Sequence, residues 1–294
     1  MARRTGWFSW LIFMIGALYF VLPLLGTFVF SLQKTRGSLG FAAYTSAFAS
    51  PGFIQAFLFS CLIATLTIVI SLLLIVPTAF WVNLRMPRWR AVVEFITLLP
   101  FVIPAIVLVF GIIKTYGKPV TVFGIPVLPS LLNTDLSTNL VLVAAYTVLS
   151  LPYMYRATDN GLRAMDVRTL AEAAQSLGAN WFVVLARVII PNLRSALLSG
   201  ALLTFAIVIG EYTIAAFLAR PMFGPYLQLQ VRNRAYEAAA LTIVAFALTW
   251  LAMGIIDRIT RGTRGGAMAG ARGQGSRAAR RVSSAVTESE SCHF

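Results

Sequence analysis

The chain has 294 residues, of which 59% are hydrophobic and 12% are charged, and its formal net charge is +14. A soluble globular domain is about 45–50% apolar and about 25% charged, so this composition excludes an ordinary soluble domain and indicates a membrane protein. His293 is the only histidine, and Cys61 and Cys292 are the only cysteines, which excludes a multi-histidine metal site and a disulfide framework.

Six apolar runs follow one another along the chain, and each approaches the roughly 20 residues needed to cross a hydrocarbon layer about 30 Å thick. They are Trp7–Ser31, Ile54–Val82, Ala91–Ile113, Asn139–Tyr155, Ser195–Ala219 and Ala238–Ile256. Two arginines precede the first run, as in a signal peptide. The run is longer than a signal core of about 7–15 residues, so we expect a retained helix. The stretch 261–294, rich in Gly, Ala, Ser and Arg, is predicted to be a disordered basic tail.

The positive charges lie mainly in short segments between these runs, which favours a topological explanation over nucleic-acid binding. Six spans put both termini on the same side of the membrane. If that side is the cytoplasm, seven of the 24 Lys and Arg residues lie outside and the remainder lie inside. The positive-inside rule therefore predicts cytoplasmic termini. The outer seven are Lys34, Arg36, Lys114, Lys118, Arg220, Arg232 and Arg234.

Two prolines interrupt the third run. Pro100 and Pro104 each remove a backbone donor and should kink the span. In membrane helices such kinks often line a cavity, where the freed carbonyls find partners. Glu94, near Arg88 and Arg90 at the start of the run, is expected to form an ion pair at the cytoplasmic interface.

The stretch between the fourth and fifth runs, about residues 158–194, is too regular for a linker. Asp166 is placed to cap the N-terminus of a helix. After it, apolar residues recur at helical spacing and form one stripe. Gly178 then suits the left-handed backbone conformation that ends many helices. The stripe consists of Val167, Leu170, Ala174 and Leu177.

A second short helix is predicted directly after that glycine. Asn180 can cap it, and it should run from Trp181 to about Ile189. Pro191 should discourage its continuation. Two short helices joined at Gly178 would form a compact knob on the cytoplasmic face. An amphipathic hairpin that rests on the membrane surface is the alternative that periodicity alone leaves open.

The residue spacing in this stretch resembles the EAA loop of bacterial ABC importer permeases. In that loop, Glu-Ala-Ala, three residues, Gly, nine residues and Ile-x-Leu-Pro follow in order. The sequence departs from it conservatively at two positions, Val188 for Ile and Ile190 for Leu. The resemblance extends from about residue 7 to residue 260. The matching residues are Glu172, Ala173, Ala174, Gly178, Val188, Ile189, Ile190 and Pro191.

The resemblance implies an all-α membrane protein with six transmembrane helices within residues 1–260, the type I ABC importer (MetI-like) permease fold. It implies a multi-pass subunit of the bacterial cytoplasmic (inner) membrane, with both termini in the cytoplasm. The implied partners are a dimer of ATP-binding subunits, a second permease subunit and an extracytoplasmic solute-binding protein, with no nucleic acid. The chain has no GxxxxGK[ST] motif, so ATP and Mg²⁺ are expected in the ATPase subunit. We expect this chain to be no enzyme and to bind no cofactor.

In such permeases the EAA loop sits in a cleft of the ATP-binding subunit and transmits its closure to the permease pair. The apolar stripe with Trp181 and Phe182 would fill the cleft, and Glu172 would bind groups at its rim. The resemblance thus assigns ATPase coupling to Glu172, Ala173, Ala174, Gly178, Trp181, Phe182 and Pro191.

Glu211 is the clearest ionisable residue inside an apolar run. A carboxylate facing lipid would be costly, so it should face a partner helix or a cavity. We interpret Glu211, with Tyr212, Thr213, Pro100 and Pro104, as candidates for a translocation pathway. The structural alternative is a buried carboxylate that is hydrogen-bonded to the backbone or to tyrosine hydroxyls.

The segments Leu99–Pro104 and Gly210–Tyr212 resemble those of spermidine/putrescine-type permeases, which implies a polyamine as cargo. The basic outer loops instead favour an anion or metal complex such as a phosphonate, molybdate or an iron chelate. Two other classes remain as alternatives. An ion-coupled secondary transporter would show an internal repeat and paired midplane carboxylates. An intramembrane enzyme would need a catalytic constellation within the spans.

Overall fold

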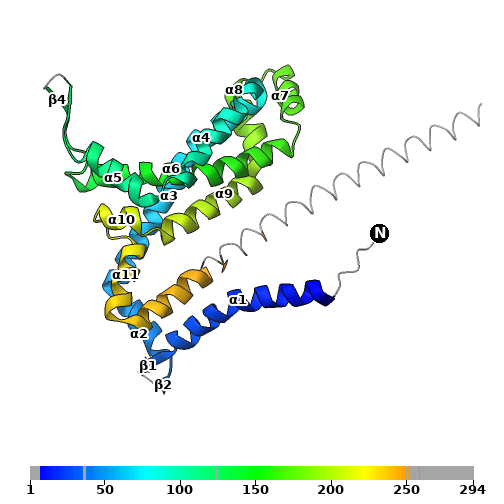
Figure 1. The fold of residues 1–294 in the computed structure, drawn as a ribbon. Helices are drawn as coiled ribbons and strands as arrows, with labels where there is room; N and C mark the ends of the chain where they lie inside the picture. The colour runs from blue at the N-terminus through cyan, green and yellow to red at the C-terminus, as the bar shows by residue number, and fades with distance from the viewer. Residues whose placement is uncertain are drawn as a thin grey trace, which may run out of the picture. The chain divides into compact units, whose positions relative to one another are not determined.

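The computed structural model describes residues 7–35, 38–122 and 125–248, together with the single positions 250, 251, 254 and 258. Residues 1–249 form one compact unit, which is separate from residues 250–294. The first unit is built almost entirely of helices (Figure 1). The predicted basic tail at 261–294 lies outside the described residues.

Four helices in the described part of the chain are long and apolar enough to cross a membrane. Three of them are α1 (Trp7–Ser31), α3 (Pro51–Arg85) and α6 (Asp135–Arg163). The fourth runs without interruption over Trp181–Gly210. It comprises α8 (Trp181–Val183), the π-helical turn η2 (Val184–Ile189) and α9 (Ile190–Gly210).

A bent pair of helices adds a fifth candidate span. It consists of η1 (Pro87–Trp89) and α4 (Arg90–Val102), followed by α5 (Ala105–Tyr116). The sixth apolar run is helical over Ala235–Leu248, and most of its later positions lie outside the described residues. The prediction of an all-helical membrane protein is confirmed. The count of six spans and the cytoplasmic termini stay predictions.

The bend in the third run is a complete break of 95° between α4 and α5. Pro104 is the residue that precedes α5, and Ile103 before it is extended, with φ −87° and ψ 116°. A residue followed by proline is pushed out of the helical region by the proline ring. Pro100 instead lies inside α4, which continues for two residues beyond it. The predicted kink is therefore present, and Pro104 accounts for its place.

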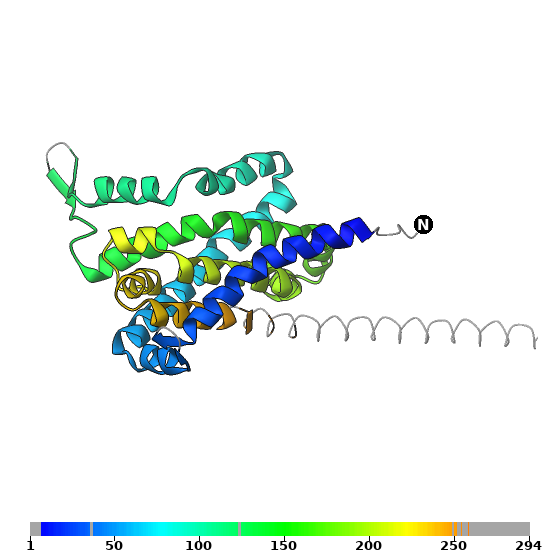
Figure 2. The same cartoon turned by 60° about the horizontal axis from the view of Figure 1, so that its bottom comes forward.

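The centre of the unit is formed by α3, α6 and α9, which pack against one another (Figures 1 and 2). Two glycines let α6 and α9 approach closely. A Cβ added to Gly161 would lie 2.7 Å from the Cβ of Ala196, and one added to Gly200 would lie 2.9 Å from the sulfur of Met154. Small residues at helix contacts are the usual means of tight packing in membranes. A hydrogen bond of 2.6 Å between the hydroxyls of Ser71 and Ser150 joins α3 to α6.

The first helix, α1, keeps its apolar surface uncovered. None of the apolar window of α1 is buried within this chain. Its contacts lie at its C-terminal end, where the rings of Phe30 and Tyr236 are 4.6 Å apart and the hydroxyls of Ser31 and Tyr44 are 2.7 Å apart. An apolar helix of this kind needs lipid or another subunit around it.

Short elements connect the long helices. They are the hairpin β1 (Gln33–Thr35) with β2 (Ser38–Leu39), helix α2 (Ala42–Ala49), the hairpin β3 (Val120–Val122) with β4 (Ile125–Leu128), α10 (Thr213–Phe217) and α11 (Phe223–Asn233). Both hairpins are antiparallel. Helix α11 is tied to α3, because the N–H of Phe223 donates to the hydroxyl of Ser60 at 2.8 Å.

Candidate functional site

The first helix of the 158–194 segment is α7 (Val167–Ser176), and it begins as predicted. The carboxylate of Asp166 accepts from the N–H of Thr169 at 3.1 Å and from its hydroxyl at 2.7 Å. Both hydrogen bonds lower the pKa of Asp166 below its ordinary value, and the bond from the Thr169 hydroxyl has the larger effect. The predicted cap is thus confirmed, and it fixes where α7 starts.

The end of α7 is also as predicted. Gly178 has a φ of +83° and is the only described glycine with a positive φ. Its N–H donates to the carbonyl of Gln175 at 2.8 Å, and the N–H of Ala179 donates to Ala174 at 3.1 Å. This pattern closes the last turn of a helix and requires a left-handed residue, which glycine adopts without strain.

The second helix begins as predicted but does not end where expected. The side-chain oxygen of Asn180 accepts from the N–H of Val183 at 2.9 Å, which caps α8. The helix then passes through Pro191 and continues to Gly210, so the prediction of a separate short helix is wrong. Pro191 lies in the first turn of α9, where a missing N–H is tolerated. The π-helical turn η2 just before it changes the hydrogen-bond register.

The apolar stripe of α7 faces the protein itself. Val167 is 8% exposed, and Leu170 and Ala174 pack against a buried cluster that includes Phe80, Met154 and Leu193. The fourth member of the stripe, Leu177, does not follow the other three: it is 90% exposed, and Phe182 beyond Gly178 is 77% exposed. The most exposed apolar side chains of the segment are therefore Leu177 and Phe182, whereas Val167, Leu170 and Ala174 hold α7 in place.

Trp181 is oriented differently from its neighbour Phe182. Its ring lies 5.4 Å from the ring of Trp81 and 6.4 Å from that of Phe80, both on α3. The guanidinium carbon of Arg85 lies 4.8 Å from the ring centre of Trp81 and 4.7 Å from that of Trp181. Sequence analysis placed Trp181 in a partner's cleft, whereas the structure places it against α3.

Two of the EAA residues lie on the outer surface of α7. Glu172 and Ala173 are exposed. The carboxylate of Glu172 pairs with Arg168 one turn earlier at 2.9 Å, and both side chains are well exposed, at 64% and 82%. An exposed pair of this kind contributes little to stability. Glu172 is therefore available to a partner at small cost.

A charged cluster at the same end of the bundle was missed by sequence analysis. Asp159 on α6 is buried, and its carboxylate contacts Arg90 at 2.8 Å, Arg163 at 2.8 Å and the amide of Asn83 at 3.0 Å. The cluster joins α3, α4 and α6. The ion pair expected for Glu94 with the nearby Arg88 or Arg90 is absent from the described part of the chain, and Arg90 pairs with Asp159 instead. Asp159 lies beyond Tyr155, where the fourth apolar run was predicted to end, so it was assigned to the loop at 158–194, whereas α6 continues to Arg163.

Glu211 lies at a break between two helices, which corrects its predicted place inside a span. It follows the last residue of α9 and is extended, with ψ 128°. Its carboxylate accepts from the hydroxyl of Tyr146 at 2.8 Å and from the N–H groups of Ile214 at 3.0 Å and Ala215 at 3.3 Å. Glu211 thus caps α10 and ties it to α6. This geometry matches the structural alternative for Glu211.

The neighbours of Glu211 complete this break. Tyr212 is exposed, and Thr213 begins α10. Gly224 of α11 packs directly on the break, since an added Cβ would lie 2.3 Å from the carbonyl oxygen of Glu211 and 3.2 Å from the Cα of Tyr212. A glycine is needed at this close approach of two backbones.

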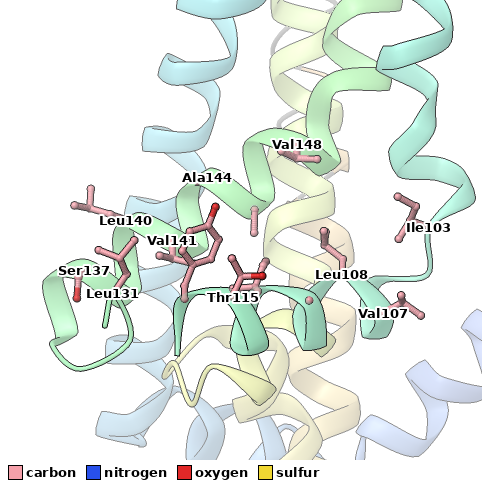
Figure 3. Close-up of a pocket in the computed structure, with 14 residues that line it drawn as sticks. Ile103, Val107, Leu108, Thr115, Leu131, Ser137, Leu140, Val141, Ala144 and Val148 are labelled. Atoms are coloured by element: carbon pink, nitrogen blue, oxygen red, sulfur yellow. The ribbon is translucent and has the colours of Figure 1, made fainter. Parts of the chain in front are cut away.

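A cavity of about 740 Å³ opens beside the bend of the third run, between α5 and α6 (Figure 3). Its lining is largely apolar, with Thr115, Tyr116 and Ser137 as the polar members. Ile103 and Val107, on either side of Pro104, contribute to its wall. The two prolines are not lining residues themselves, so Pro104 shapes this cavity through the bend.

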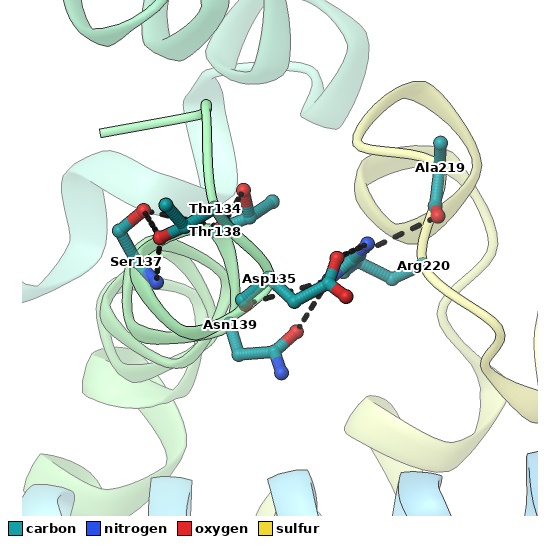
Figure 4. A network of polar contacts seen from close by, with 7 residues as sticks. All are labelled: Thr134, Asp135, Ser137, Thr138, Asn139, Ala219 and Arg220. Atoms are coloured by element: carbon teal, nitrogen blue, oxygen red, sulfur yellow. Dashed lines mark hydrogen bonds and ion pairs between the residues drawn. The ribbon is translucent and has the colours of Figure 1, made fainter. Parts of the chain in front are cut away.

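A second charged contact closes the opposite end of the bundle, and sequence analysis missed it (Figure 4). Arg220, in the turn after α10, pairs with Asp135 at 2.7 Å and donates to the side chain of Asn139 at 3.1 Å. Ala219 before it has a φ of +51° and is the only described non-glycine residue in the left-handed region. Arg220 therefore anchors a strained turn to the start of α6.

The comparisons with known proteins agree on one class. The model of the family described as binding-protein-dependent transport system inner membrane component matches residues 71–265. The spermidine/putrescine transport system permease protein PotB of Haemophilus influenzae is 28% identical over 226 residues, 72% of this chain and 74% of that protein. A probable molybdenum ABC transporter permease of Haloferax volcanii is 28% identical over 239 residues, 81% of this chain and 83% of that protein.

One solved structure supports the same fold. It is the crystal structure of a bacterial ABC transporter involved in the import of the acidic polysaccharide alginate. The two chains superpose with a TM-score of 0.63 at 18% identity, and the match covers 87% of this chain and 96% of that one. At this identity the match carries the fold alone.

Proposed function

Because the chain belongs to the family of binding-protein-dependent transport system inner membrane components, we propose that it is the permease subunit of an ATP-driven importer, with its ATPase docked on α7 and α8. In this proposal the chain forms half of the translocation pathway in the bacterial cytoplasmic membrane. A second permease subunit supplies the other half, and a solute-binding protein delivers the cargo from outside. ATP and Mg²⁺ are bound by the ATPase, and this chain catalyses no reaction.

The observation that carries the proposal is the rigid surface around Gly178. Capped helices on both sides hold Leu177 and Phe182 exposed, next to the accessible carboxylate of Glu172. Exposed apolar side chains rimmed by polar ones mark a protein contact. Helix α8 continues directly into α9, so a force on this surface reaches the membrane domain without a flexible joint.

Co-purification with the ATPase tests this docking surface. Phe182→Ala and Gly178→Asp should each reduce the amount of ATPase recovered with the tagged permease, because the first removes a contact and the second strains the left-handed turn. Phe41→Ala, at an exposed position of the opposite loop, and Gly40→Asp, where an added Cβ meets nothing within 4 Å, are matched controls and should leave recovery unchanged. Full recovery with both α7–α8 variants would refute the docking site.

A polyamine is the first candidate for the cargo. The resemblance of the segment around Glu211 to polyamine-type permeases and the match to the spermidine/putrescine permease support it. An oxyanion such as molybdate is the second candidate. The carboxylate of Glu211 already accepts from three internal donors, which leaves it little capacity to bind a polycation. Uptake of labelled spermidine and of labelled molybdate, each compared with a strain that lacks the permease, distinguishes the two.

A further inference from the structure

Trp81, Arg85 and Trp181 form a stack on the cytoplasmic end of α3, which we call the Trp–Arg–Trp stack. The guanidinium carbon of Arg85 lies 4.8 Å from the ring centre of Trp81 and 4.7 Å from that of Trp181, and the two ring centres are 5.4 Å apart. Trp81 and Arg85 are one helical turn apart and so lie on the same face of α3. The third member, Trp181, comes from the first residue of α8.

The stack is specific to the arginine. None of the ion pairs in the described part of the chain involves Arg85. Its guanidinium instead contacts the two indole rings. A guanidinium is attracted to the face of an indole ring, and its planar shape lets it contact two rings at once. Lysine at this position would keep the charge but lose the planar contact.

The stack joins parts of the chain that have different roles. Helix α8 carries Phe182 of the docking surface and continues into α9, whereas α3 packs against α6 and α9 in the centre of the bundle. Val184 and Ile189, which follow α8 in the same helix, already pack with Phe80 of α3 in a buried cluster, and the stack adds a contact at the end of α3. With it, α3 receives the same movement at its cytoplasmic end.

We propose that the Trp–Arg–Trp stack is a positioning element that couples the ATPase-docking surface to α3 and thereby sets how much solute is transported per ATP. The inference rests on the proposed function. Trp181 acts here inside the permease and does not contact the ATPase. Trp81 and Trp181 are partly buried and pack against the buried cluster beneath α7, whereas Arg85 is exposed. Replacing the arginine therefore removes the stack with the least disturbance of the fold.

The test uses the complete transporter, with ATPase and binding protein, reconstituted into liposomes. ATP hydrolysis and solute uptake are measured in the same vesicles for wild type, Arg85→Gln and Arg85→Lys. Arg88→Gln is the matched control, because Arg88 is an exposed arginine on η1 nearby. Arg85→Gln should keep the ATPase bound and active but lower uptake per ATP by about threefold. Arg85→Lys should recover part of the ratio, and Arg88→Gln should equal wild type.

An unchanged ratio of uptake to hydrolysis in Arg85→Gln would overturn the inference, as would an equal fall in the Arg88→Gln control. A second comparison uses Trp181→Leu, alone and combined with Arg85→Gln. The double variant should be no worse than the more severe single variant, because both remove the same contact. If wild-type permease fails to recruit an ATPase at all, the proposed function fails, and this outcome is separate from a failure of the stack.

Discussion

At the scale of single residues, Glu211 illustrates how a carboxylate in an apolar run can be used for structure. Its oxygens accept from the hydroxyl of Tyr146 and from two N–H groups of α10. Every one of these partners is a donor. The sequence identified Glu211 as unusual because charge within a span is costly, but it could not supply the partners, which come from α6 and from a helix break.

Glu211→Gln should destabilise this break. The amide retains one acceptor and turns an NH₂ donor towards groups that also donate, so we expect a loss of about 1–3 kcal/mol. Thermal unfolding in detergent measures the loss. Tyr146→Phe, which removes a single donor, should have a smaller effect. A Glu211→Gln variant that loses transport while its unfolding temperature stays unchanged would contradict the structural role. It would support Glu211 as a residue of the translocation pathway.

Asp159 is the second residue whose removal has a clear expected cost. Asp159→Asn would leave Arg90 and Arg163 without their shared carboxylate and loosen α4 from α3 and α6. We expect a destabilisation of about 2 kcal/mol, below the value for fully buried pairs because both arginines are partly exposed. Asp135→Asn is the control, since Asp135 is 88% exposed, and it should cost less. Equal unfolding temperatures for the two variants would show that the cluster stabilises the protein no more than the exposed pair does.

At the scale of elements, local signals predicted more than long-range ones. The caps at Asp166 and Asn180 and the helix end at Gly178 were predicted correctly, because each depends on a few adjacent residues. The passage of the helix through Pro191 was not, because the π-helical turn that permits it has no clear sequence pattern. The stripe on α7 was recognised, but periodicity cannot tell whether an apolar face covers the chain's own core or a partner.

The break between α4 and α5 gives a prediction at this scale. Pro104→Ala should let Ile103 return to the helical region, so that α4 and α5 straighten. Spin labels at Val92 and Lys114 would then move apart towards about 33 Å, the length of a continuous helix between them. Double electron–electron resonance measures this distance. Pro100→Ala, inside α4, should leave it unchanged, and the same distance in all three proteins would show that Pro104 does not set the bend.

At the scale of the whole molecule, the sequence predicted the class of protein and the family, whereas the environment of α1 follows only from the structure. Six apolar runs gave helices, but hydropathy does not distinguish a helix packed in the bundle from one left uncovered. The whole apolar window of α1 is unburied in this chain. Under the proposed function, the uncovered surface of α1 would contact a second permease subunit and lipid.

The proposed orientation can be tested by labelling single cysteines, after replacement of Cys61 and Cys292 by alanine. Phe41→Cys should react with a membrane-impermeant maleimide in intact cells, because α2 is expected outside. Leu177→Cys should react only after the membrane is opened. Both positions are well exposed, at 69% and 90%, so access to the side chain does not limit the reaction. The reverse pattern would place the termini outside the cytoplasm.

The unbroken helix from Trp181 to Gly210 has a mechanical consequence. Thirty residues make a rod of about 45 Å, close to the full thickness of a membrane with its headgroups. One end carries the proposed docking surface, and the other end stops at the Glu211 break. A tilt of about 5° around one end displaces the other by about 4 Å, by simple lever geometry. A small tilt of this helix at the docking surface would therefore displace the Glu211 break by several ångströms.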